Sequence, residues 1–171
     1  FSIIQTLTFI GSAHQSAKRF EQARPYLLEA LKLCFDPSHE SYAAHALNLL
    51  GVSFAAINDQ PSALNHFQRA LAKLEKLSDR EGMAESHLYL ALSYYLQRNH
   101  TKALEHAQTS YKFATEIGKR EWQWQNLIAI GQIQQALNHP QEAQQAYQAA
   151  ISIIESMRGN LTGGEEQSQA S

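Results

Sequence analysis

The chain has 171 residues, a formal net charge of -2 and a pI of about 6.5. Its length suits one domain or one short repeat array, and its near-neutral charge disfavours non-specific nucleic-acid binding, which needs a strongly basic face. Apolar residues make up 44% of the chain, but no segment has the roughly 18 uninterrupted apolar residues of a membrane span. We therefore expect neither nucleic acid nor a membrane as a partner.

Cysteine usage and the first residue bear on location and completeness. Cys34 is the only cysteine, so an internal disulfide is impossible, and a lone thiol fits a reducing cytoplasm. The chain begins with Phe1 rather than Met, and Phe1-Ser2-Ile3-Ile4 already resembles the apolar face of a helix. We therefore expect a cytoplasmic protein and a sequence that was cut from a longer one.

The strongest pattern is a repeat of 40 residues. Four apolar segments align without gaps and end at Gly11, Gly51, Ala91 and Gly131. An alanine follows twelve residues later in every copy, and the residue four positions further on is usually large; these pairs are Ala23 and Leu27, Ala63 and Phe67, Ala103 and Ala107, and Ala143 and Tyr147. Small residues let two helices cross closely, and the large residue fills the space beside them.

The repeated segments predict eight helices, because apolar residues recur in them with a period near 3.6. In chain order the predicted helices cover residues 2–16, 20–34, 40–57, 61–77, 80–97, 101–117, 120–137 and 140–157. The turns include Asn58-Asp59-Gln60-Pro61, Arg98-Asn99-His100-Thr101 and Leu137-Asn138-His139-Pro140. Asparagine tolerates the left-handed conformation that ends a helix, and proline or threonine suits the start of the next one.

The second copy carries a family resemblance in Leu50-Gly51, Phe54, Ala63, Phe67 and Ala70. This pattern resembles the tetratricopeptide repeat, in an extended form, because the usual repeat has about 34 residues. The resemblance implies an all-α, right-handed α-solenoid of four antiparallel helix hairpins, with repeats at about 1–38, 39–78, 79–118 and 119–157. The third copy departs from the pattern at Ala91 and Ala107, so we expect it to pack differently.

Residues 158–171 form a polar, glycine-containing tail, which we interpret as a linker or a fraying terminus. A second resemblance covers about fifty residues, from Glu121-Trp122 through Ala150-Ile151 and Ile154-Glu155 to Gly163-Gly164-Glu165. This region is similar to the last repeat of proteins in which such repeats precede a caspase-like CHAT domain. The resemblance implies a regulatory or recruiting arm, with the catalytic residues of that family outside this chain.

The sequence offers little for catalysis or metal binding. Its eight histidines are spread over all four copies, without a His-Glu-x-x-His or Cys-x-x-Cys motif. Nothing in the sequence places a histidine base beside Cys34, which falls late in a predicted second helix and which we interpret as a small buried residue. Trp122 and Trp124 begin the seventh helix, and we expect them to pack against the preceding repeat rather than form a binding platform. We therefore predict no cofactor, no metal site and no enzymatic activity.

The family resemblance places the partner-binding surface on the first helix of each pair, along the concave face of the solenoid. The inward positions lie six and three residues before the Gly/Ala position and one and four residues after it. In the first two copies these are Gln5, Thr8, Ser12, Gln15, His45, Asn48, Val52 and Ala55. In the last two copies they are Glu85, Leu88, Leu92, Tyr95, Gln125, Ile128, Gln132 and Gln135.

The predicted surface is rich in amides at both ends, apolar in the middle, and without lysine or arginine. The basic clamp that related repeats use for an acidic chaperone tail is absent, since only Asn48 is reminiscent of it. We expect a protein or peptide partner with a few apolar anchors, in a larger signalling or protease-like protein. The alternatives are a small-peptide sensor, a structural spacer, or catalysis by histidine and Cys34, and the open ends of the solenoid predict possible end-to-end self-association.

Overall fold

The computed structural model describes the backbone of residues 2–168 and the side chains of residues 2–159. Within this range the chain forms eight α-helices and one short 3-10 helix, η1, at Pro37–His39, with no strand. The helices are α1 (Ile3–Ser16), α2 (Phe20–Leu33), α3 (Glu40–Ala56), α4 (Gln60–Leu77), α5 (Arg80–Leu96), α6 (His100–Glu116), α7 (Arg120–Ala136) and α8 (Pro140–Ser168). The predicted all-α solenoid is confirmed, and the first seven helices start and end within one residue of their predicted bounds.

The eighth helix is longer than predicted. It continues to Ser168 instead of ending near residue 157, so it includes most of the segment that we expected to be a linker. Gly163 and Gly164 lower helix propensity by about 1 kcal/mol each relative to alanine but do not forbid the conformation, and residues 158–168 contain no proline. The division into a repeat domain and a tail remains a prediction, and residues 169–171, like Phe1, lie outside the described part.

The turns follow the predicted chemistry with one exchange of roles. Asn58 and Asn138 adopt the left-handed conformation after α3 and α7, with φ of 63° and 62°. In the third copy Arg98 takes this conformation, with φ of 60°, and the neighbouring Asn99 instead caps α6 by accepting a hydrogen bond from the Lys102 backbone N–H. Asparagine is well suited to both roles, and the sequence alone did not separate them.

Each hairpin is held by the small and large residues of the repeat. A methyl group added at Gly51 would lie 2.6 Å from Cδ1 of Phe67, and one added at Gly131 would lie 2.7 Å from Cδ1 of Tyr147. Four alanines, Ala23, Ala63, Ala103 and Ala143, are at most 1% exposed. The glycine therefore sits directly under the large side chain, and the two helices cross at a distance that only small residues permit.

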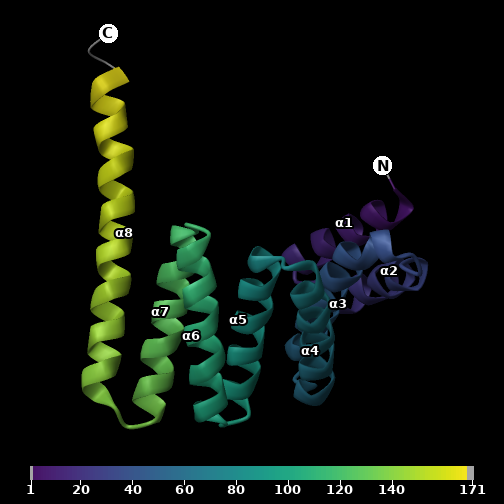
Figure 1. Cartoon of the computed structure of the whole chain (residues 1–171), viewed down its shortest axis with the longest axis horizontal. Helices are drawn as coiled ribbons and strands as arrows, with labels where there is room; N and C mark the ends of the chain where they lie inside the picture. The colour runs from purple at the N-terminus through teal and green to yellow at the C-terminus, as the bar shows by residue number, and fades with distance from the viewer. Residues whose placement is uncertain (1, 169–171) are drawn as a thin grey trace.

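The four hairpins stack side by side in a row, from α1 and α2 at one end to α8 at the other, where α8 extends past its neighbours (Figure 1). The first helices of successive repeats contact one another, whereas in the described residues the second helices of successive repeats do not. The first helices therefore form the closer-packed layer, and the array curves toward it. We call the solvent-facing side of α1, α3, α5 and α7 the inner surface.

Candidate functional site

The predicted partner-binding residues lie on the four helices of the inner surface, but they differ in exposure. Thr8 and Asn48 are buried, at 5% and 2% exposure, so we correct the prediction that their side chains are available to a partner. His45, Leu92, Gln125, Gln132 and Gln135 are exposed. The remaining members are half-buried: Gln5, Ser12, Gln15, Val52, Glu85, Leu88, Tyr95 and Ile128.

Asn48 joins the second repeat to the third. Its Nδ2 donates to Ser86 Oγ at 2.9 Å and to Glu85 Oε2 at 3.3 Å, and its Oδ1 accepts from Ser86 Oγ at 3.1 Å. A buried amide with all these partners is a structural group, because losing one of them would leave a buried polar atom unsatisfied. Asn48 therefore holds the second and third repeats together, and this structural role accounts for the asparagine that resembled a residue of the basic clamp.

Two further amides of the predicted surface are used between repeats. Gln5 donates from Nε2 to the Tyr42 hydroxyl, and Gln15 donates from Nε2 to the Leu49 carbonyl and to Ser53 Oγ, the last at 2.8 Å. These bonds tie α1 to α3. Both N-terminal amides thus make hydrogen bonds that stack the helices, and their contact with the backbone of a peptide remains a prediction.

The middle of the inner surface carries apolar side chains that are exposed or half-buried. Leu92 is 43% exposed, and Leu88 and Tyr95 lie on the same face of α5, with Ile128 on the adjacent α7. We call these four residues the apolar strip. On α7 the strip is flanked by exposed glutamines, Gln125, Gln132 and Gln135, and Gln135 accepts a hydrogen bond from the Tyr147 hydroxyl at 3.0 Å.

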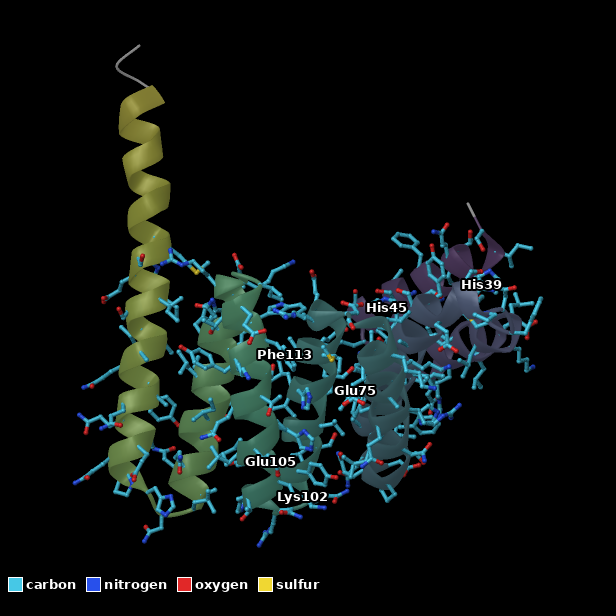
Figure 2. All side chains as sticks on the ribbon, viewed as in Figure 1. His39, His45, Glu75, Lys102, Glu105 and Phe113 are labelled. Carbon is cyan, nitrogen blue, oxygen red and sulfur yellow. The ribbon has the colours of Figure 1, made fainter. Side chains whose placement is uncertain are left out.

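A pocket of about 490 Å³ opens beside this strip, between α3, α5 and the start of α7. It is lined by residues from four helices and one turn: Ser41, Tyr42, His45, Asn48, Leu74, Asp79, Glu81, Gly82, Glu85 and Trp122. Figure 2 labels His45 on α3, near the upper edge of the array, which is the side toward which the C-terminal end of α8 points. We call this the α3–α5 pocket. It is acidic, since three carboxylates and neither lysine nor arginine line it within the described residues.

A family model described as tetratricopeptide repeat matches residues 2–76 and 82–156, which is most of the chain. The chain belongs to the tetratricopeptide repeat family. No curated protein matches the sequence. Nothing among the comparisons indicates an association of this tetratricopeptide repeat chain with a CHAT domain.

Solved structures share the fold of this tetratricopeptide repeat chain at low identity. BtubC from P. vanneervenii is 18% identical with a TM-score of 0.82, over 91% of this chain and 65% of its own. The apo form of RapI is 13% identical with a TM-score of 0.86, over 95% and 60%. A STAND protein with a tetratricopeptide repeat sensor from Pyrococcus horikoshii is 18% identical with a TM-score of 0.80, over 88% and 23%. The chain thus spans less than two thirds of the length of these neighbours.

The third tetratricopeptide repeat contains a pair of histidines in its interior. Nδ1 of His87 and Nδ1 of His106 are 2.9 Å apart, and the His106 ring stacks on Tyr94 with centroids 5.4 Å apart. Burial, and secondarily the neighbouring His106, lower the pKa of His87 from 6.5 to about 4. The rings also pack against aromatic neighbours, His87 against Phe113 and His106 against Tyr94, so the pair is a packing element of the third repeat. No group of three metal-ligating side chains occurs among the described residues.

Cys34 lies at the end of α2, where its thiol donates to the Ala30 carbonyl at 3.2 Å. Burial raises the pKa of this thiol, which lowers the fraction of the nucleophilic thiolate. Across the described part of the chain, no helix combines the length and apolar character that crossing a membrane requires.

The pocket includes residues outside the predicted partner-binding set, namely Ser41, Tyr42, Leu74, Asp79, Glu81, Gly82 and Trp122. Of these, only Trp122 was singled out in the sequence, where it was expected to pack against the preceding repeat. The predicted inner-surface positions on this side lie six and three residues before the Gly/Ala position. Tyr42, Gly82 and Trp122 lie nine residues before it. The alternation of aromatic, glycine and aromatic at this position was the available signal. It marks a gap at α5 between large side chains on the two flanking first helices, α3 and α7.

Proposed function

We propose that this tetratricopeptide repeat chain is a non-catalytic module that binds a protein or peptide partner on its inner surface. Tetratricopeptide repeats generally mediate protein–protein interaction. The observation that carries the proposal is the apolar strip, where Leu92 is 43% exposed on the side of α5 that no other helix of the array covers. Exposed apolar groups beside exposed amides suit a partner segment with apolar anchors and a hydrogen-bonded backbone.

The proposal favours a partner-binding role over catalysis. The Cys34 thiol is hydrogen-bonded to a backbone carbonyl and has a raised pKa. His87 on α5 and His106 on α6 bond to each other. A nucleophile needs a base within hydrogen-bond reach, and neither group has such a pairing. We place the module in the cytoplasm and exclude nucleic acid and membranes as its partners, in keeping with its charge and its single thiol.

The experiment selects peptides from a random displayed library on the wild-type chain and measures their affinities by fluorescence polarisation. Leu92→Asp is expected to weaken binding at least tenfold, because it places a charge in the apolar strip. The matched control is Gln108→Asp, at an exposed position on the outer layer in α6, which is expected to leave the affinity unchanged. Equal losses in both variants, or no selected peptide at all, would refute this function.

A finer proposal is that the module is the regulatory arm of a larger signalling or protease-like protein, as the resemblance to repeats that precede a CHAT domain implies. One structural neighbour is described as a multidomain protein with a tetratricopeptide repeat sensor, of which this chain covers 23%. In such a protein, the extension of α8 to Ser168 would connect the repeats to the following domain through a helix. Sequencing the gene beyond the codon for Ser171 tests this idea, and a caspase-like domain there is the expected result.

A further inference from the structure

The α3–α5 pocket exists because a glycine stands between two aromatic residues. Tyr42, Gly82 and Trp122 occupy equivalent positions, 40 residues apart, on α3, α5 and α7, and all three line the pocket. A Cβ atom at Gly82 would lie 3.1 Å from Cδ1 of Leu74, so the Leu74 side chain would have to shift to admit any other residue here. The hollow thus lies at a glycine, with an aromatic residue on each side.

Two of the three carboxylates of this pocket, Asp79 and Glu85, are held by neutral donors rather than by cations. Glu85 accepts from the Tyr89 hydroxyl at 3.0 Å and from Asn48 Nδ2 at 3.3 Å. Asp79 caps α5 by accepting from the Gly82 backbone N–H at 3.0 Å. Within the described residues neither carboxylate has a salt bridge. Both are positioned by hydrogen bonds, and neither is paired with a cationic side chain of the described residues.

The edge of the pocket already binds one cation of the chain itself. The Lys119 ammonium lies 2.9 Å from Glu81 Oε1 and 5.6 Å from the centroid of the Trp122 ring. A carboxylate and an indole face thus hold a cationic side chain together at this site. Asp79 and Glu85, the other two carboxylates of the pocket, offer the same chemistry to a cationic group of another molecule.

We propose that the α3–α5 pocket binds an arginine side chain of the partner segment whose apolar residues lie on the apolar strip. A guanidinium group stacks on indole faces, forms paired hydrogen bonds with carboxylates, and loses hydration more readily than an ammonium group. The pocket supplies Trp122 for stacking and Glu85 and Asp79 for the charge. This inference rests on the proposed function and adds the charge that a partner must carry.

The test uses the chain with Trp124→Phe, which leaves Trp122 as the only tryptophan, and follows its fluorescence at constant ionic strength. The probes are the capped tripeptide Gly-Arg-Gly, its lysine counterpart, and its citrulline counterpart, which has the shape of arginine without the charge. We expect saturable binding of the arginine peptide, weaker binding of the lysine peptide, and none of the citrulline peptide.

Two substitutions neutralise the pocket while keeping its hydrogen bonds. Glu85→Gln is expected to weaken the arginine peptide about tenfold, the effect of one charge-assisted hydrogen bond. Asp79→Asn is expected to weaken it several-fold, and it preserves the helix cap because asparagine caps as well as aspartate. The control is Glu105→Gln on α6, which Figure 2 shows near the opposite edge of the array from His45, and it should bind like the parent.

Equal binding of the citrulline peptide, or an unchanged affinity in both pocket variants with intact melting curves, would overturn the inference. Equal binding of the lysine peptide would overturn the assignment to arginine. The library-selected peptides separate this failure from that of the proposed function. If they bind and are sensitive to Leu92→Asp but show no dependence on arginine or Glu85, the inner surface binds partners and the arginine pocket is wrong.

Discussion

Replacement of Gly51 by alanine should destabilise the second repeat, and removing the aromatic ring above it should reverse the sign of the effect. The new methyl group would lie 2.6 Å from Cδ1 and 2.8 Å from Cζ of Phe67, whereas carbon atoms in good contact are about 3.5–4.0 Å apart. Phe67 is 2% exposed and its ring stacks on Tyr89 with centroids 5.1 Å apart. The ring therefore has to move by about 1 Å inside a packed core.

The magnitude follows from two opposing contributions. Overpacking of this kind costs about 1–3 kcal/mol, and the higher helix propensity of alanine returns about 1 kcal/mol, so Gly51→Ala should destabilise by up to about 2 kcal/mol. With Phe67→Ala already present, the same change should stabilise by about 1–2 kcal/mol, since propensity and the burial of a methyl group then act together. The third repeat carries this combination naturally, with Ala91 and Ala107 both fully buried.

The assay is urea denaturation of the four proteins of this double-mutant cycle, followed by helical circular dichroism. Gly159→Ala is the control for helix propensity alone, because nothing lies within 4 Å of a Cβ there, and it should be neutral or slightly stabilising. If Phe67→Ala unfolds the chain, the reciprocal cycle of Ala107→Phe with Ala91→Gly tests the same contact. Additivity of the two changes within about 0.5 kcal/mol in either cycle would refute the packing argument.

Two further predictions concern the interior between and within repeats. Asn48→Ala should cost about 1–3 kcal/mol in urea denaturation, since it leaves Ser86 without its partner. Asn126→Ala should cost less, because its buried Oδ1 has no hydrogen-bond partner and its Nδ2 donates only to the Trp122 carbonyl of the same helix, at 2.8 Å. Equal costs would contradict this account of the amides. The pKa of His87 is lower in the folded chain (about 4) than its ordinary value of 6.5, so stability is complete above pH 6.5 and falls as the pH drops from about 6.5 to about 4. His87→Leu, which restores the residue of the other copies, should flatten this part of the pH profile of the denaturation midpoint, and an unchanged slope would assign it to other groups.

The sequence by itself determined the helices and their stacking in this protein. A 40-residue repeat of small and large residues, such as Gly51 with Phe67, can only be satisfied by hairpins whose helices cross closely. Because these signals are local and recur four times, the bounds of seven helices could be placed to within one residue. The end of α8 could not, since glycine weakens a helix without stopping it.

Tertiary structure alone decided which polar side chains of the inner surface are available. The repeat pattern assigned both Asn48 and Gln135 to the inner surface, yet Asn48 is buried against Ser86 whereas Gln135 is exposed. The volume and charge of the α3–α5 pocket were likewise decided by tertiary structure, because the pocket arises where Gly82 separates Tyr42 from Trp122 across three helices. A hydrogen bond between repeats depends on the distance between two particular atoms, and periodicity in one dimension contains no information about that distance.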